Sequence, residues 1–224
     1  MSHKYNVNNR GFTLVELLIA MTITTIVSAG IFSAYQNQQK AQLAQKQVIE
    51  MQQNLRVALY IMTSDIRMAG YDPDGTSGTG IVSAGDGSNG YPLAFNFLAD
   101  DDNRDNDNDS TVDEPGEIQY VAYDLYDGYG DGDTDIGKKV SDATGAIHQP
   151  LAENIKTLQF AYLDEDGAIV SLPPSLHQVA ALDLPKIKSV QITIEATIDI
   201  NETDYVKGKN RILTTTVKCR NLGL

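Results

Sequence analysis

One carboxylate in an otherwise uncharged run is the residue of this sequence with the clearest chemical consequence. From Phe12 to Tyr35 there is no Lys, Arg, Asp or Pro, and Glu16 carries the only charge. A helix over this run would be about 36 Å long, which is enough to cross a hydrocarbon core of roughly 30 Å. An ionised group there costs at least about 2.5 kcal/mol, so Glu16 requires a partner or a specific purpose.

A second group of carboxylates, in the middle of the chain, has the spacing to bind a hard cation. Nine acidic residues lie between Asp100 and Glu117, opposed only by Arg104. Their oxygen donors follow the D-x-D-x-D spacing of a calcium loop, although Ser110 replaces the turn glycine. We therefore predict a calcium site, with a solvated acidic loop that holds no ordered metal as the alternative. The predicted ligands are Asp105, Asp107, Asp109, Asp113 and Glu114, and an overlapping register would begin at Asp101 and Asn103.

A long N-terminal helix must position Glu16. No proline interrupts residues 12–69, and the pattern becomes amphipathic after Tyr35. Apolar side chains then recur at intervals of three and four residues, as on one face of a helix, and Gly70 is a typical C-terminal stop. Residues 36–70 are therefore predicted to pack this face on a globular domain. The face consists of Val48, Met51, Leu55, Leu59, Met62 and Ile66.

The rest of the chain has the pattern of β-strands separated by loops. Residues 71–90 are rich in Gly, Asp, Ser and Thr and are predicted to form a loop. Beyond them, alternation of apolar and polar residues predicts an antiparallel sheet with one solvated face. The expected fold class is therefore α+β, with a long helix packed on an antiparallel β-sheet with long acidic loops. The predicted strands lie at 117–125, 158–162, 168–170, 189–200 and 213–219, and a turn at 164–167 joins the second and third into a hairpin.

The residues around Glu16 resemble the signal of type IV prepilins (class III). A short polar leader containing Lys4 and Arg10 ends at Gly11, and the run FTLVEL follows. In that family a prepilin peptidase cuts after the glycine and methylates the new terminal phenylalanine. The family's glutamate neutralises the terminal amine of a neighbouring subunit. The resemblance implies cleavage between Gly11 and Phe12, N-methylation of Phe12 and an assembly role for Glu16.

Two other kinds of N-terminal segment share parts of this pattern. A secretory signal peptide would have a shorter apolar core followed by a small-residue cleavage site, whereas here the polar part precedes the predicted cut. An ordinary signal anchor would be equally apolar, and Lys4 and Arg10 would keep its N-terminus in the cytoplasm. Neither gives a reason for Gly, Phe and Glu at this spacing, so the prepilin interpretation is favoured.

Other parts of the chain narrow the resemblance to minor pilins. Major type IV pilins commonly carry a proline in the apolar half of the helix and two cysteines that close a C-terminal loop, and this sequence has neither. The segments 65–71 and 211–221 resemble the helix end and the C-terminal strand of PilW-like minor subunits. The resemblance implies a minor pilin that helps to initiate pilus assembly, at or near the tip. A GspJ-like minor pseudopilin of a type II secretion system is the alternative.

The resemblance also implies a division of the chain and a route through the cell. Residues 1–11 would be the leader peptide, 12–35 the transmembrane or filament-core half of the helix, 36–70 its amphipathic half, and 71–224 the globular head. The subunit would cross the bacterial inner membrane once, with a periplasmic head, before it enters the pilus on the cell surface. The implied partners are other minor and major pilins, the prepilin peptidase, the inner-membrane assembly platform and the membrane.

Composition and motifs argue against two broad classes of function. The formal charge of −13, which becomes about −15 without residues 1–11, is unsuited to binding nucleic acid phosphates. The motifs of serine hydrolases, zinc proteases and phosphate-binding loops are absent, and the three histidines are scattered, so we expect no enzyme.

A membrane-anchored calcium-binding or adhesive domain that never polymerises is the alternative of another class. The only cysteine, Cys219, is predicted to be a buried thiol.

Overall fold

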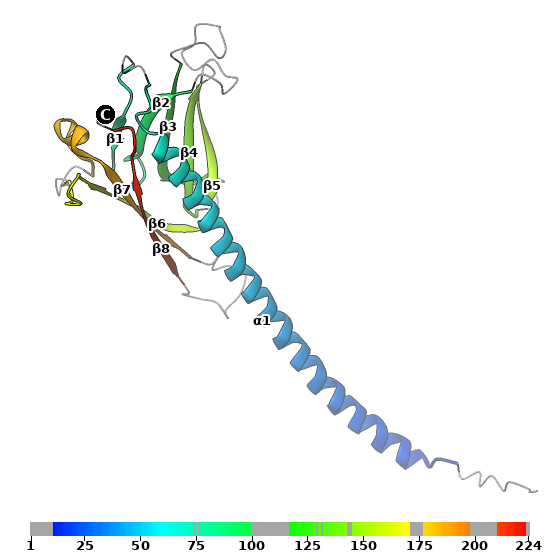
Figure 1. Cartoon of the computed structure of the whole chain (residues 1–224). Helices are drawn as coiled ribbons and strands as arrows, with labels where there is room; N and C mark the ends of the chain where they lie inside the picture. The colour runs from blue at the N-terminus through cyan, green and yellow to red at the C-terminus, as the bar shows by residue number, and fades with distance from the viewer. Residues whose placement is uncertain are drawn as a thin grey trace, which may run out of the picture. The chain divides into compact units, whose positions relative to one another are not determined.

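The computed structural model of the chain describes residues 11–73, 75, 77–99, 117–128, 130, 132–142, 145–170, 177–197 and 210–222. Within this part, one long α-helix precedes two antiparallel β-sheets (Figure 1). The chain divides into two compact units, residues 1–46 and 47–224. The second unit contains the end of the helix and both sheets. The expected α+β fold, like that of pilins, is confirmed.

Helix α1 runs without interruption from Leu14 to Met68, so the continuous helix predicted from the lack of proline is confirmed. The helix stops at Gly70, whose φ of +76° lies in the left-handed region that favours glycine. The Gly70 amide donates a hydrogen bond to the carbonyl of Asn96 at 3.0 Å. This bond ties the end of the helix to strand β2 (Leu93–Leu98) of the first sheet.

The second half of α1 contributes one apolar face to the core of the larger unit, as its spacing predicts. Four of the six predicted side chains are fully buried, whereas Val48 and Leu59 are half-buried. Ala58 lies on the same face and is also buried, although the predicted stripe omits it. The buried set is Met51, Leu55, Ala58, Met62 and Ile66.

The first sheet has five strands in sequence order, β1 (Ile81–Ala84), β2, β3 (Ile118–Tyr126), β4 (Asp135–Asp142) and β5 (Gly145–Ala152). Strand β3 confirms the strand predicted over 117–125, and it lies at the centre of the sheet. The prediction of a loop over 71–90 is wrong in part, because β1 lies within that range. With only four residues, β1 is too short to show a clear alternation.

The second sheet has three strands in the order β6 (Ile155–Leu163), β7 (Ser189–Ala196) and β8 (Arg211–Lys218). The alternation predicted for β7 and its pairing with β8 are both confirmed. The predicted turn at 164–167 also forms, and the return segment at 168–170 pairs with β6 only through a single antiparallel bridge, between Leu163 and Ile169. The pairing does not extend into a strand, because further along the same edge of β6 the Phe160 amide donates to the Asp86 carbonyl instead.

One loop joins the two sheets through backbone hydrogen bonds. The Asp86 carbonyl accepts the amide of Phe160 in β6, and the Gly87 carbonyl accepts the amide of Leu125 in β3, each at 3.1 Å. The prediction of a single sheet is therefore wrong. Because this loop takes hydrogen-bonding positions on the edge of β6 that β7 leaves open, the strands divide into two sheets.

Candidate functional site

The predicted assembly carboxylate, Glu16, forms a reciprocal cap at the start of α1. The Thr13 amide donates to Glu16 Oε2 at 2.9 Å, and the Glu16 amide donates to Thr13 Oγ1 at 3.3 Å. The Thr13 hydroxyl also donates to Oε2, at 3.0 Å. This is a capping box, which satisfies two backbone amides that the first turn of a helix leaves without partners. The cap holds Oε2, and no described residue donates a hydrogen bond to Oε1.

Nothing in the described part of the chain requires a glycine at position 11. Its φ is outside the left-handed region, and a Cβ added there would have no atom within 4 Å. The neighbouring Phe12 side chain is 91% exposed. Since the fold tolerates a side chain at Gly11, a requirement for glycine would have to come from another protein that reads this junction.

The apolar half of α1 meets the length and composition of a membrane-spanning helix. An 18-residue window has a mean hydropathy of 2.0 and none of it is buried within the chain. Three threonines in this half donate their hydroxyls to carbonyls one turn back, at 2.7–2.8 Å. These bonds satisfy groups that hydrocarbon could not. The threonines are Thr22, Thr24 and Thr25.

The apolar helix, the capped carboxylate near its start and the sheets that follow define a type IV pilin-like or pseudopilin-like protein. The profile of the prokaryotic N-terminal methylation motif matches residues 6–32, which include Gly11, Phe12 and Glu16. A comparison with curated proteins returned no match. The chain therefore carries a class III prepilin signal and resembles type IV pilins and pseudopilins at its N-terminus.

This signal and the apolar helix together indicate anchoring in the inner membrane and later incorporation into a pilus. The prepilin peptidase and pilus assembly proteins are the partners that go with such a signal. Cleavage between Gly11 and Phe12, methylation of Phe12 and the assembly role of Glu16 stay predictions at the level of single residues.

The predicted calcium ligands lie outside the described residues. They are Asp105, Asp107, Asp109, Asp113 and Glu114, with Asp101 and Asn103 of the alternative register. Across the residues that are described, no three His, Cys, Asp or Glu side chains are grouped as a metal site. The calcium site therefore stays a prediction.

A carboxylate on the helix anchors α1 to the first sheet. Asp65 Oδ2 accepts the hydroxyl of Tyr123 and lies 2.5 Å from Lys138 Nζ. Tyr123 is fully buried, and burial together with the Asp65 charge raises the pKa of its phenol. Because the three side chains come from α1, β3 and β4, their hydrogen bonds hold the helix end in register with the sheet.

The sequence does not reveal a second ionic cluster, which lies across three neighbouring strands. Asp124 in β3 is only 3% exposed, and its carboxylate lies 3.0 Å from Lys139 Nζ and 3.0 Å from His148 Nε2. The histidine and carboxylate are close enough to interact electrostatically, but they are not aligned for a hydrogen bond. The His148 ring stacks on Tyr126 with centroids 3.5 Å apart. Gly137 in β4 lies opposite Asp124 and leaves room for the ring.

We expect His148 to make the stability of the head depend on pH. Burial lowers the pKa of its imidazole; Asp124 opposes this effect and Lys139 adds to it. Since the folded-state pKa lies below the unfolded value near 6.5, the unfolded chain binds more protons as the pH falls. The free energy of unfolding should therefore decrease from pH 7 to pH 5, with an uptake of less than one proton from this residue.

Calorimetric melting of the wild type and of His148→Gln between pH 7 and pH 5 measures this dependence. The variant keeps His177 but should show a shallower fall in melting temperature. If the two curves run parallel across this range, His148 is not the group responsible.

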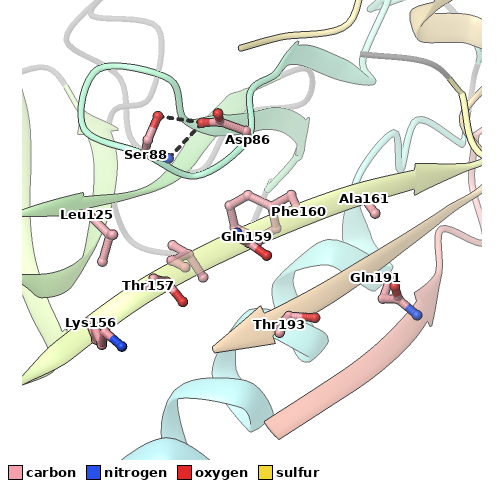
Figure 2. A pocket seen from close by; sticks show the side chains of 11 residues that line it. Asp86, Ser88, Leu125, Lys156, Thr157, Gln159, Phe160, Ala161, Gln191 and Thr193 are labelled. Atoms are coloured by element: carbon pink, nitrogen blue, oxygen red, sulfur yellow. Dashed lines mark hydrogen bonds between the residues drawn. The ribbon is translucent and has the colours of Figure 1, made fainter. Parts of the chain in front are cut away.

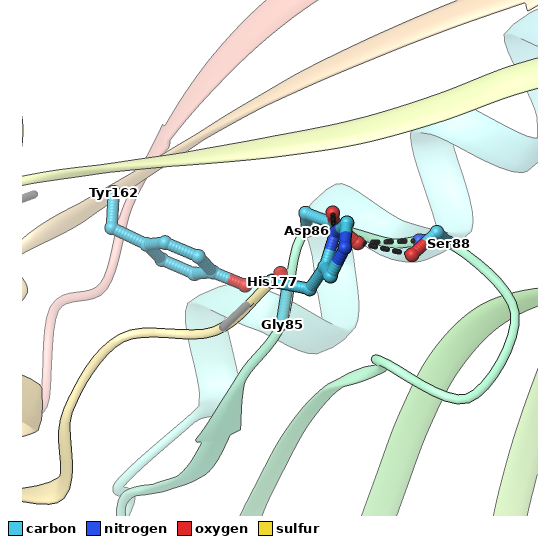
Figure 3. A network of polar contacts seen from close by, with 5 residues as sticks. All are labelled: Gly85, Asp86, Ser88, Tyr162 and His177. Atoms are coloured by element: carbon cyan, nitrogen blue, oxygen red, sulfur yellow. Dashed lines mark hydrogen bonds and ion pairs between the residues drawn. The ribbon is translucent and has the colours of Figure 1, made fainter. Parts of the chain in front are cut away.

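The other head histidine also meets a carboxylate, at the loop that joins the sheets. Asp86 lies at the rim of a groove beside β6 and β7 (Figure 2). Its carboxylate accepts the amide and hydroxyl of Ser88 at 2.9 and 2.5 Å, and lies 2.6 Å from His177 Nδ1 (Figure 3). The adjacent Gly85 carbonyl accepts the hydroxyl of the fully buried Tyr162 at 2.5 Å. The loop is therefore held in place from both sheets.

These contacts determine the ionisation of Asp86. Burial alone would raise the pKa of its carboxyl, but the hydrogen bonds from Ser88 and the nearby His177 outweigh burial and lower it. The carboxylate is therefore charged and oriented at neutral pH. No sequence pattern indicates this group, because five strands, β2 to β6, separate His177 from Asp86 along the chain.

Cys219 is buried, as predicted. Burial raises the pKa of its thiol to about 12. The thiolate is the reactive form, so this cysteine is chemically inert at neutral pH.

Proposed function

We propose that this chain is a minor type IV pilin that primes pilus assembly, in the manner of PilW-like subunits. The observation that supports the assembly role best is the geometry at Glu16. The capping box fixes the side chain through Oε2, while Oε1 is left without a hydrogen-bond donor among the described residues. A carboxylate held in this way can accept an ammonium group from another subunit without giving up its own helix cap.

The proposed sequence of events begins at the junction between Gly11 and Phe12. The peptidase removes residues 1–11 and methylates the amine that cleavage creates on Phe12. The apolar half of α1 keeps the subunit in the inner membrane until it exchanges lipid for the helices of neighbouring subunits. Pairing of Glu16 with a terminal amine then offsets the cost of burying both charges and selects the axial register.

Mass spectrometry of the protein purified from its host membrane tests the first step. The expected mature chain begins at Phe12 and carries one additional methyl group. The same measurement after deletion of the prepilin peptidase should return the chain with residues 1–11 intact. Detection of an uncut N-terminus in the wild-type host would contradict the proposal.

The minor-pilin role and its alternative, a GspJ-like pseudopilin, are separated by genetics. Loss of the chain should reduce pilus number if it primes pilus assembly, and should reduce protein secretion if it belongs to a type II secretion system. The absence of proline from the apolar half of α1 supports a minor rather than a major subunit. Calcium binding by the acidic loop at residues 101–114 is a separate proposal, which the spacing of its carboxylates supports.

A further inference from the structure

Strand β8 forms an open edge of the second sheet (Figure 1). Its neighbour β7 pairs with it on one side, where the Cys219 amide, just after β8, donates to the Lys188 carbonyl at 3.0 Å. Hydrogen-bonded pairs recur at every second residue of an antiparallel ladder, so the odd-numbered residues of β8 direct their backbone groups to β7. The even-numbered residues direct theirs away from β7, and no other described residue bonds these groups. They are Ile212, Thr214, Thr216 and Lys218.

The other three sheet edges are covered or interrupted. On the edge of β6, the Phe160 amide donates to the Asp86 carbonyl. Beyond the end of β1, Gly85 forms a bridge with Gln178. Strand β5 contains Pro150, which cannot donate a hydrogen bond to an added strand. In contrast, β8 contains no proline or glycine and pairs with β7 in a regular register, so among the described strands its edge is the best suited to join another strand.

The residue types of β8 also favour pairing with a further strand. Five of its eight residues are β-branched, a type that is enriched in strands. The side chains of all four outward-directed residues are exposed, so an added strand would not have to displace them from a core. An edge of this kind promotes aggregation when it stays unpaired, so we expect a partner to cover it.

Charge determines which strand can join this edge. Arg211 begins β8 and Lys218 ends it, and both side chains are exposed. Among the described residues, neither forms an ion pair. Residues 205–224 contain five basic residues and no acidic one, whereas the whole chain carries a charge of −13. The edge is therefore basic on an otherwise acidic protein.

This distribution of charge disfavours a second copy of β8 as the partner. In the central antiparallel register, Arg211 of each strand would lie opposite Lys218 of the other, and like charges directly opposite each other are destabilising. A strand with a carboxylate near each end would instead place an acid opposite each cation. We propose that the edge of β8 binds an extended acidic segment of another protein, which adds to the second sheet as a fourth strand. This surface goes beyond the proposed role of Glu16 and does not depend on it.

The two kinds of contact at this edge have different tasks. Main-chain hydrogen bonds to the outward-directed residues supply affinity for any extended strand, whatever its sequence. The two cations select an acidic strand and reject a basic one, which gives specificity. Because both cations are exposed, salt screens this selection, and binding should weaken as the salt concentration rises.

Fluorescence anisotropy with the full chain in uncharged detergent micelles tests the proposal. The probe is a dye-labelled peptide with blocked ends, ETVTVTVE, whose two glutamates have the same spacing as Arg211 and Lys218. The matched peptide KTVTVTVK differs only in the sign of its charges. The acidic peptide should bind at least tenfold more tightly than the basic one, and this difference should shrink when salt is raised from about 50 mM to about 500 mM.

Variants of β8 separate the backbone contribution from the charge. Thr216→Pro removes an outward amide but no ladder bond to β7, so the strand should still form. It should weaken binding of ETVTVTVE at least tenfold, whereas the matched control Thr216→Ala keeps the amide and should bind as the wild type does. Arg211→Glu should weaken the acidic peptide and strengthen the basic one. Its control is Arg56→Glu on α1, which changes the net charge equally at another exposed site and should leave both affinities within about twofold.

Several results would overturn the proposal. It fails if ETVTVTVE does not bind, if KTVTVTVK binds equally well, or if Arg211→Glu has no more effect than Arg56→Glu. It also fails if Thr216→Pro, shown by its melting curve to be folded, binds as tightly as Thr216→Ala. Self-association in sedimentation velocity that Thr216→Pro abolishes would show that a second copy occupies the edge instead. None of these results affects N-terminal processing or pilus number, so the two proposals fail separately.

Discussion

Replacing Glu16 by glutamine is expected to reduce incorporation into filaments at least tenfold while the helix start stays capped. A capping box accepts Gln as well as Glu at this position. The side-chain carbonyl oxygen of the glutamine can therefore still accept a hydrogen bond from the backbone amide of Thr13. The negative charge, however, is lost, and the terminal ammonium of a neighbouring subunit would be buried without a counterion. Leaving one member of a buried ion pair without its partner costs roughly 3–5 kcal/mol. A tenfold loss of incorporation corresponds to only about 1.4 kcal/mol, so the expected loss is at least tenfold.

The matched control weakens the cap and keeps the charge. Thr13→Ala loses the hydroxyl that accepts the Glu16 amide, and such a change costs about 0.5–2 kcal/mol of helix stability. It should nevertheless assemble, because the Glu16 carboxylate is intact. Sheared filaments quantified by immunoblot measure incorporation, and mass spectrometry checks that both variants are cut after Gly11. If Glu16→Gln enters filaments normally while Thr13→Ala does not, the role of Glu16 is local capping and not pairing between subunits.

The sequence predicted the parts of the molecule whose signal is local. Helix α1 follows from an unbroken periodicity that ends at Gly70, and β7 follows from its regular alternation of apolar and polar residues. The Gly11–Glu16 junction is equally local, since its residues lie within six consecutive positions. In each case neighbouring residues carry the whole pattern, so no tertiary information was needed.

The missed features depend on contacts between residues far apart in the chain. Strand β4 contains Gly137 and two lysines and has little apolar character, so only its pairing with β3 and β5 makes it a strand. That pairing in turn brings His148 to Asp124. The scattered histidines gave no indication of two histidine–carboxylate contacts, because the sheet register, and not sequence spacing, creates them.

The same register makes Gly137 a glycine whose replacement should destabilise the head. A Cβ at this position would lie 1.8 Å from His148 Nε2 and 2.8 Å from Tyr126 Cδ1. The histidine ring cannot simply move aside, because it is stacked on Tyr126 and lies against the buried Asp124. Overpacking of this kind costs about 1–3 kcal/mol, so Gly137→Ala should lower the melting temperature of the full chain by roughly 3–10 °C.

A rescue experiment separates this clash from a general effect of changing a glycine. Gly80→Ala is the control, because its Cβ would meet only Leu222 at an ordinary contact distance of 3.7 Å. Its melting temperature should stay within about 2 °C of the wild type, since mild surface changes stay within about 0.5 kcal/mol. Removing the ring with His148→Ala should restore part of the stability lost in Gly137→Ala, with a coupling of about 0.5–3 kcal/mol between the two sites. Additive losses in the double variant would show that the histidine does not occupy the space left by Gly137, and the cluster across β3, β4 and β5 would then need another explanation.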